Sequence, residues 1–247
     1  MAKTIALIGL PVTNHFVINS NGDVEDYYPV NSPGFTAKTL ELLAEESLGQ
    51  GLIISAKEEI VLPDYDVSIE DLLTAGTYIR QKAKDADRVI CFGPSHFGAL
   101  AFYNGREKVA RFDCHGDYFS EKSLAPKESF PGSSYASYMN AVEKRFRGVK
   151  VLNYGVLKMK ILGERAIQEE KKYLSANHFD IDLDVFAAGL RMNNEPCKSY
   201  FKPHELLEIL AEAKPRKIGI WEYRQEEDLA GNALKFLLDT VKVPVKD

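Results

Sequence analysis

The 247-residue sequence has no excess of positive charge. It contains 31 Lys and Arg residues against 36 Asp and Glu residues, which gives a net charge of -5. Proteins that bind the nucleic-acid backbone neutralise phosphates with Lys and Arg, so this composition argues against a nucleic-acid partner. A hydrophobic content of 45% and a charged content of 27% are ordinary for a globular protein, which argues against an intrinsically disordered chain.

Long apolar runs and paired cysteines are also missing. The first apolar stretch, residues 5–10, is interrupted by Pro11 and is much shorter than the about 20 residues of a membrane-spanning helix. It has no small-residue cleavage site of the kind that ends a signal peptide. The three cysteines form no CxxC pair, which suits a reducing compartment. We therefore expect a cytoplasmic protein with no membrane partner.

Glycine-rich phosphate-binding loops are absent from the sequence. The first apolar stretch ends in Gly9-Leu10-Pro11-Val12, which is not a GxGxxG motif, and GxxxxGK[ST] does not occur. These loops cradle dinucleotides and nucleoside triphosphates in many α/β proteins. Their absence argues against a dinucleotide-dependent enzyme and against an ATPase.

Short runs rich in Val, Ile and Phe alternate with amphipathic stretches along the whole chain. The runs predict strands at residues 3–10, 51–55, 88–92, 108–112, 150–153, 178–182 and 217–221. The amphipathic stretches predict helices near residues 35–47, 69–84, 134–146, 161–175, 204–213 and 228–241. Asn21-Gly22 predicts a hairpin turn or a loop excursion after the first strand. This order predicts a three-layer α/β/α fold with a mostly parallel central sheet, in a single domain over residues 1–247.

The segment after the strand at 108–112 contains three possible metal ligands. Asp113, His115 and Asp117 alternate along the chain, so an extended backbone would direct all three side chains to one side. Ligands of open parallel sheets bind at the carboxyl ends of the strands, where this segment lies. A solvent-exposed polar loop could show the same alternation, so the motif needs support from elsewhere in the chain.

Two other strand ends give that support. Asp180 and Asp182 alternate within an otherwise apolar segment, where carboxylates are costly unless a cation compensates their charge. His96 follows the strand at 88–92, again at its carboxyl end. A donor set of carboxylates and imidazoles suits Mn²⁺, whereas structural zinc prefers sulfur-rich sites. We therefore predict a metal centre at this edge of the sheet.

A histidine after a glycine turn, followed by D-x-H-x-D and then by F-D-x-D, resembles the ureohydrolase family of arginase and agmatinase. The resemblance runs from about Arg88 to the end of the sequence, and it includes Glu222 in the segment after the last predicted strand. It implies an arginase/deacetylase-like fold and a homo-oligomer. It also implies hydrolysis of linear C–N bonds in a small cationic guanidino, amidino or formimino compound.

The resemblance further implies two Mn²⁺ ions per chain and a hydroxide between them that attacks the substrate carbon. The ligands of one ion would be His96, Asp113, Asp117 and Asp180. The ligands of the other would be His115, Asp113, Asp180 and Asp182. Asp117 would orient the nucleophile or take its proton, and Glu222 would pair with the cationic group of the substrate.

The sequence departs from the family pattern in two places that bear on catalysis. Gly93-Pro94-Ser95-His96 replaces the usual Gly-Gly-Asp-His, so a carboxylate near the metal is missing. Many members have a proton-shuttling histidine soon after D-x-H-x-D, but residues 118–177 contain no histidine. His15, after the first strand, is the best candidate for this role, while His178 and His204 have weaker claims.

Two other functions remain open. One is an amidohydrolase with a single zinc ion, which resembles the deacetylase branch of the same fold. The other is a non-catalytic descendant that keeps the metal. The substrate cannot be named, because specificity would depend on loops around residues 11–34 and 118–135, where the resemblance fades.

Overall fold

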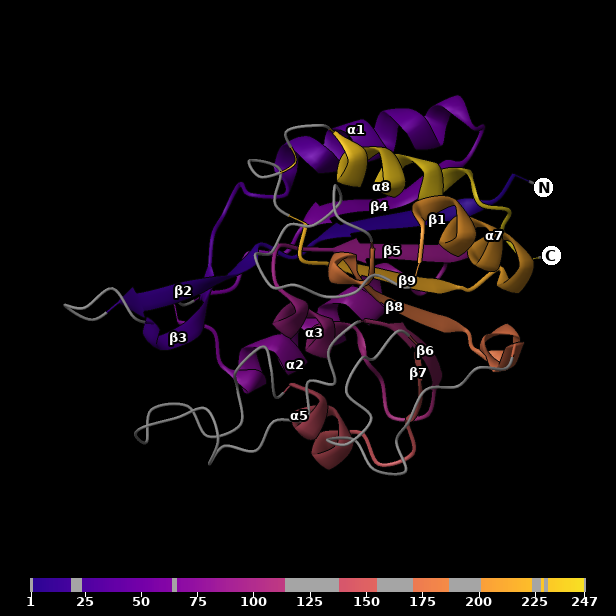
Figure 1. The fold of residues 1–247 in the computed structure, drawn as a ribbon. Helices are drawn as coiled ribbons and strands as arrows, with labels where there is room; N and C mark the ends of the chain where they lie inside the picture. The colour runs from indigo at the N-terminus through magenta and orange to yellow at the C-terminus, as the bar shows by residue number, and fades with distance from the viewer. Residues whose placement is uncertain are drawn as a thin grey trace.

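A seven-stranded parallel sheet forms the centre of the molecule (Figure 1). The structure is a computed structural model, and it describes residues 2–18, 24–63, 66–113, 138–154, 171–186, 201–223, 228 and 231–246. The sheet order is β4-β1-β5-β9-β8-β6-β7, and every pairing is parallel. Its strands are β1 (Thr4–Gly9), β4 (Ile53–Glu59), β5 (Arg88–Phe92), β6 (Lys108–Phe112), β7 (Lys150–Tyr154), β8 (His178–Asp182) and β9 (Lys217–Trp221).

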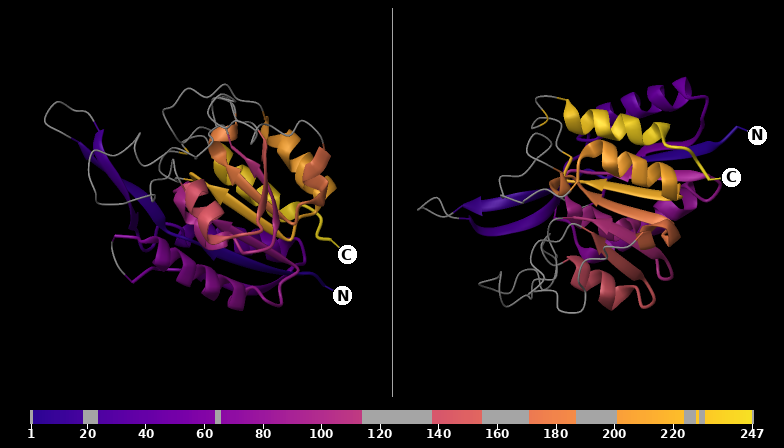
Figure 2. Two further views of the ribbon diagram at one scale, coloured as in Figure 1. Left: turned by 90° about the horizontal axis from the view of Figure 1, so that it is seen from below. Right: turned by 45° about the vertical axis from the view of Figure 1, so that its right-hand side comes forward.

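Helices cover both faces of this sheet, as Figure 1 and the two views of Figure 2 show. One face carries α1 (Ala37–Gly49), α7 (Pro203–Ala213) and α8 (Asn232–Lys242). The other face carries α2 (Ile69–Lys82), α3 (Ala99–Phe102) and α5 (Tyr138–Arg145). The predicted three-layer α/β/α fold with a parallel central sheet is therefore confirmed.

Two apolar cores lie between the sheet and its helical layers. In β1, Ile5 and Leu7 belong to the core under α1, α7 and α8, whereas Ala6 and Ile8 belong to the core on the α2 side. The alternation follows from the extended backbone, which directs successive side chains to opposite faces. Because helices cover both faces, the inner strands are buried and mostly apolar, as expected for a parallel sheet.

The edge strand and the helices differ in places from the sequence prediction. Strand β4 begins two residues later than predicted and continues to Glu59 through a polar segment, because side chains on an edge strand can face solvent. Helix α3 was not predicted, since four residues are too few to show a helical period. Most of the predicted helix at 161–175 lies outside the described residues, and its end, Lys171–Ser175, is a 3₁₀ helix.

A two-stranded antiparallel hairpin projects from the end of the sheet where β1 finishes (Figures 1 and 2). It consists of β2 (Val12–Ile18) and β3 (Val24–Asn31), which confirms the hairpin predicted around Asn21-Gly22, although residues 19–23 are outside the described part. His15 lies within β2 and pairs in register with Tyr28. Among the described residues, no helix is both long and apolar enough to cross a membrane.

Candidate metal centre

Five acidic and histidine side chains meet at the carboxyl ends of adjacent central strands. His96 is in a 3₁₀ turn (His96–Gly98) just after β5, and Asp113 directly follows β6. Asp180 and Asp182 belong to β8, and Glu222 directly follows β9. Since β5, β9, β8 and β6 are neighbours in the sheet, their ends bring these residues together. None of the five is more than 4% exposed.

The His96 ring is at the centre of this group. Its Nδ1 lies 2.7 Å from Asp182 Oδ2 and 3.1 Å from Asp113 Oδ2. Its Nε2 lies 3.2 Å from Asp180 Oδ1. One donor atom from each of His96, Asp113 and Asp182 can be chosen such that all three lie within 4.8 Å of one another. The three side chains thus converge closely enough to hold one cation.

The electrostatics of the group also favour a cation. Burial lowers the pKa of His96, but the carboxylates of Asp180 and Asp182 outweigh this and raise that pKa well above its usual value. The pKa of Asp182 is raised by burial, by Asp184 and by Asp113. Buried carboxylates that face one another in this way are unfavourable unless positive charge compensates them. Oxygen donors with an imidazole nitrogen fit a divalent ion such as Mn²⁺ or Zn²⁺, so the residues present fit the metal that the resemblance implies.

Hydrogen bonds from surrounding residues hold the candidate ligands in place. The Tyr103 hydroxyl donates to Asp180 Oδ2 at 2.6 Å, and the Asp184 backbone N–H donates to Asp182 Oδ1 at 2.8 Å. The Arg111 guanidinium donates to Asp113 Oδ2. Sequence reasoning missed all three donors. Only Arg111 left a signal, because its position two residues before Asp113 places both side chains on one side of β6.

Glu222 is held against the turn that carries His96. Its Oε1 accepts a hydrogen bond from the His96 backbone N–H at 3.1 Å, and the next residue, Tyr223, donates its N–H to the Gly93 carbonyl at 3.1 Å. Glu222 has a φ of 61°, a left-handed conformation that costs a non-glycine residue about 1–3 kcal/mol. The strained backbone thus belongs to the residue whose carboxylate contacts the turn that carries His96.

The structure therefore brings together five of the predicted site residues: His96, Asp113, Asp180, Asp182 and Glu222. His115 and Asp117 lie outside the described residues, and the side chain of His15 is also outside the described part. The resemblance assigns His96 and Asp182 to different ions, but here the imidazole and the carboxylate are in direct contact.

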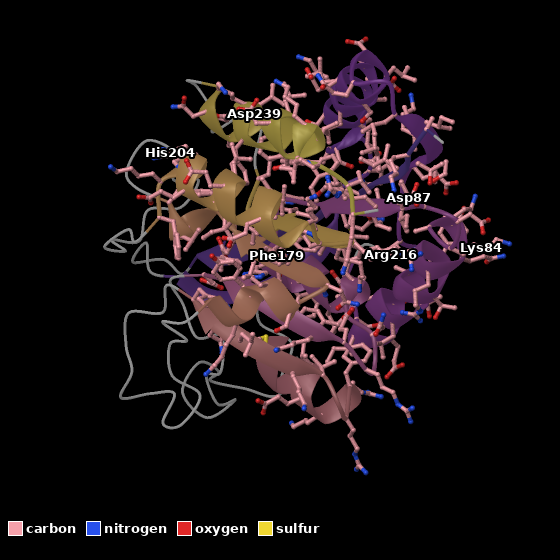
Figure 3. All side chains as sticks on the ribbon, turned by 90° about the vertical axis from the view of Figure 1, so that its right-hand side faces the viewer. Lys84, Asp87, Phe179, His204, Arg216 and Asp239 are labelled. Carbon is pink, nitrogen blue, oxygen red and sulfur yellow. The ribbon has the colours of Figure 1, made fainter. Side chains whose placement is uncertain are left out.

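Neither of the two weaker histidine candidates joins the group as a ligand. His178 is buried in β8, where its Nδ1 lies 3.1 Å from Glu107 Oε1. The Lys217 ammonium donates to the other oxygen of Glu107 at 2.8 Å. His204 is exposed at the beginning of α7, on the outer surface seen in Figure 3. His178 thus belongs to a cluster with Glu107 and Lys217 around the beginning of β8 and β9.

A separate pocket of about 540 Å³ lies at the opposite end of the sheet, where the strands begin. Its lining includes Lys84, Asp87 and Arg216, which are labelled in Figure 3. Asp87 accepts hydrogen bonds from the backbone and hydroxyl of Thr4, and Arg216 donates to the carbonyls of Lys84 and Ala86. These hydrogen bonds connect chain segments at the end of the sheet opposite the candidate centre.

No protein-family model matches the sequence, and no curated protein matches it. Solved structures do match. Arginase from Bacillus subtilis superposes with a TM-score of 0.67 over 99% of this chain and 99% of that chain, at 15% sequence identity. A putative agmatinase from Clostridium difficile gives a TM-score of 0.66 over 98% and 96%, at 15% identity. Proclavaminate amidino hydrolase from Streptomyces clavuligerus gives 0.64 over 98% and 90%, at 14% identity.

At these low identities the similarity establishes the fold. The chain has the arginase-like α/β fold over nearly its whole length, and the resemblance to ureohydrolases is confirmed at that level. Fold alone does not determine activity, which depends on the side chains of the site.

Proposed function

We propose that this protein is a metal-dependent hydrolase of linear C–N bonds in a small cationic guanidino, amidino or formimino compound, with places for two Mn²⁺ ions. The observation that carries the proposal is the convergence of His96, Asp113 and Asp182 at the carboxyl ends of the central strands. In an open α/β sheet this edge is where ligands bind. The proteins with the same fold are named as enzymes that act on guanidino compounds or their relatives.

The metal ligands would come from the same group of side chains. His96, Asp113, Asp180 and Asp182 are in place to hold divalent ions, and His115 and Asp117 would complete the set as in the resembled family. When bound, two such ions lower the pKa of water from 15.7 towards about 7 and so provide a nucleophile at neutral pH.

The remaining residues of the site would bind the substrate and move protons. Glu222 adds a buried negative charge beside the centre, which favours a cationic group of the substrate there. Asp117 would orient the attacking water or accept its proton. His15 would protonate the leaving nitrogen, a step for which a general acid typically contributes about 10²–10⁴ in rate.

A second candidate is an amidohydrolase with a single zinc ion. Catalytic zinc sites commonly use three protein ligands and leave a fourth position open. The compact group of His96, Asp113 and Asp182 supplies that number. Metal analysis at saturating metal distinguishes the candidates, because two Mn²⁺ per chain favour the first and one Zn²⁺ favours the second.

The test of the function is a substrate screen with the Mn²⁺-loaded protein. Guanidino, amidino and formimino compounds are incubated with it, and release of urea, ammonia or formamide is measured. Asp182→Asn should abolish turnover, whereas the same change at Asp239, which pairs with Lys235 and Lys242 on α8 (Figure 3), should leave it unchanged. If the fully loaded protein releases no product from any compound, a non-catalytic metal-binding descendant becomes the better description.

A further inference from the structure

The pocket at the end of the sheet where the strands begin has an excess of positive charge (Figure 3). Its volume of about 540 Å³ is within the range of small-molecule sites, which is about 300–1,000 Å³. Two acidic side chains line it, Asp85 and Asp87, against five basic ones: Lys3, Lys84, Lys214, Arg216 and Lys246. The chain as a whole has a net charge of -5, so the pocket is opposite in sign to the protein around it.

The central sheet and nearby hydrogen bonds fix two of these cations. Lys3 and Arg216 directly precede β1 and β9, which both pair with β5. The Lys3 ammonium donates to the Lys246 carbonyl at 3.0 Å, and Arg216 Nη2 donates to the carbonyls of Lys84 and Ala86, each at 3.2 Å. Arg216 Nε and Nη1 make no hydrogen bond with any described residue, so they are available to a bound anion.

Lys214 lines the same pocket in a strained conformation. It ends α7 with a φ of 48°, in the left-handed region that glycine adopts without steric cost. Its backbone N–H donates to the Leu210 carbonyl at 2.8 Å, which closes the helix and would do so equally well with glycine. Strained residues are concentrated at functional sites, so the side chain of Lys214 is the feature that this strain indicates.

Helix ends explain only part of this charge. The carbonyl end of a helix has a partial negative charge that attracts lysine, which accounts for Lys84 after α2 and Lys214 after α7. It does not account for Lys3, Arg216 and Lys246. The pocket is on the order of 10 Å across, about one Debye length at physiological salt, so its cations are incompletely screened and repel one another. A bound anion would relieve this repulsion.

We propose that this pocket binds a small molecule with two or more adjacent negative charges, which is the shared chemistry of phosphate esters and polycarboxylates. The Arg216 guanidinium would bind two oxygens of one anionic group, a geometry that suits both phosphate and carboxylate. Lys84 and Lys214 would contribute ammonium groups to the remaining charge. The site lies at the opposite end of the sheet from the candidate metal centre, so the inference does not rest on the proposed function.

The test is a calorimetric titration of the full-length protein, without added metal, with pyrophosphate, citrate and acetate. Pyrophosphate and citrate should each bind once per chain and at least about ten-fold more tightly than acetate, because they accept additional hydrogen bonds from charged donors. The tighter of the two identifies the phosphate or the carboxylate class. Binding should weaken as NaCl is added, since salt screens charges that face solvent.

Lys214→Gly is the decisive variant, because it removes the ammonium and relieves the strained backbone together. The dissociation constant for pyrophosphate should rise by about ten-fold, while the melting temperature stays the same or increases. Lys84→Gln, at a side chain that is 71% exposed, should raise this constant by a smaller factor without affecting folding. Lys202→Gln is the matched control, since it removes one positive charge at the other end of α7 and should leave binding unchanged.

Three results would overturn the inference. The first is that neither pyrophosphate nor citrate binds to the folded wild type. The second is an unchanged dissociation constant in both Lys214→Gly and Lys84→Gln. The third is weaker binding in Asp182→Asn together with wild-type binding in Lys214→Gly, which would assign the anion to the candidate metal centre. None of the three tests hydrolysis, so the proposed function is judged separately by its own substrate screen.

Discussion

Replacement of Glu107 by Gln should remove the carboxylate that joins His178 and Lys217 where β8 and β9 begin. The Glu107 carboxylate accepts the Lys217 ammonium at 2.8 Å and the Asn104 backbone N–H at 2.7 Å, and it lies 3.1 Å from His178 Nδ1. Its side chain is 2% exposed, so solvent screens these contacts very little. His178 shares β8 with Asp180, which connects the cluster to the candidate ligands.

The size of the effect follows from the acidity of the carboxyl. Burial alone would raise the pKa of Glu107, but His178 and Lys217 outweigh it and lower that pKa from 4.5 to about 2. This difference sets an upper limit of about 3 kcal/mol, at about 1.4 kcal/mol per pH unit, because the part that comes from His178 requires a protonated ring. The folded-state pKa is the lower one, so the stabilisation is fully present above pH 4.5 and is lost as the pH falls towards about 2.

His178 makes the protein sensitive to acid in the same direction. Burial and the charge of Lys217 lower the pKa of His178 below 6.5, so the unfolded chain takes up this proton first on acidification. Stability from a neutral buried His178 is therefore present above pH 6.5 and decreases below it. The wild type should lose stability in two stages, first below pH 6.5 and then below pH 4.5.

Urea denaturation of the metal-free protein between pH 7 and pH 3 measures this effect. Glu107→Gln should lower the free energy of unfolding by about 1.5–3 kcal/mol at pH 7, because hydrogen bonds to a buried charged group are lost, and the difference should shrink below pH 4.5. Glu58→Gln is the control, since its contact with Lys82 is partly exposed and such pairs contribute about 0–1 kcal/mol. A loss below about 1 kcal/mol for Glu107→Gln, or a loss independent of pH, would refute the reasoning.

Three further predictions concern the candidate centre directly. Asp180→Ala and His115→Ala should each weaken Mn²⁺ binding by at least about ten-fold in equilibrium dialysis, because each removes a ligand; retention of both ions by either variant contradicts the assignment. Glu222→Gln should raise KM for a cationic substrate while metal content stays the same, so loss of metal would show that Glu222 does not act on the substrate. Tyr103→Phe should destabilise the metal-free protein by about 1.5–3 kcal/mol in urea denaturation, since Asp180 loses a hydrogen bond to a charged group; unchanged stability would mean that this bond contributes nothing.

Four of the inner strands could be predicted residue by residue from the sequence, and the prediction for β1 exceeds its observed bounds by one residue at each end. The predicted strands at 88–92, 108–112, 178–182 and 217–221 agree with the observed bounds of β5, β6, β8 and β9. These strands are buried on both faces, so each is a short apolar run that ends at polar residues. Edge strand β4 lacks this property, so the sequence predicts its end at Ser55, just before the polar half that continues to Glu59.

Only those residues of the metal centre that lie on a predicted strand, or directly after one, could be predicted from the sequence. The alternation of Asp180 and Asp182 within β8 is visible in the sequence, as is the position of His96 after β5. Tyr103 follows a short helix, and no local pattern indicates that its hydroxyl reaches Asp180. Such contacts depend on the order of the strands in the sheet, which helix and strand periods do not encode.

The same contacts indicate where a first cation is needed most. The charge of Asp180 is balanced within the protein, because His96, His178 and Arg111 lower its pKa despite complete burial. The pKa of Asp182, two residues later on the same strand, is raised, because burial, Asp184 and Asp113 outweigh the lowering effect of His96. A divalent ion therefore gains more beside Asp182 than beside Asp180, and His96 Nδ1 lies 2.7 Å from Asp182 Oδ2. The protein's own cations thus balance Asp180 and leave Asp182 as the carboxylate beside which a bound cation is most favourable.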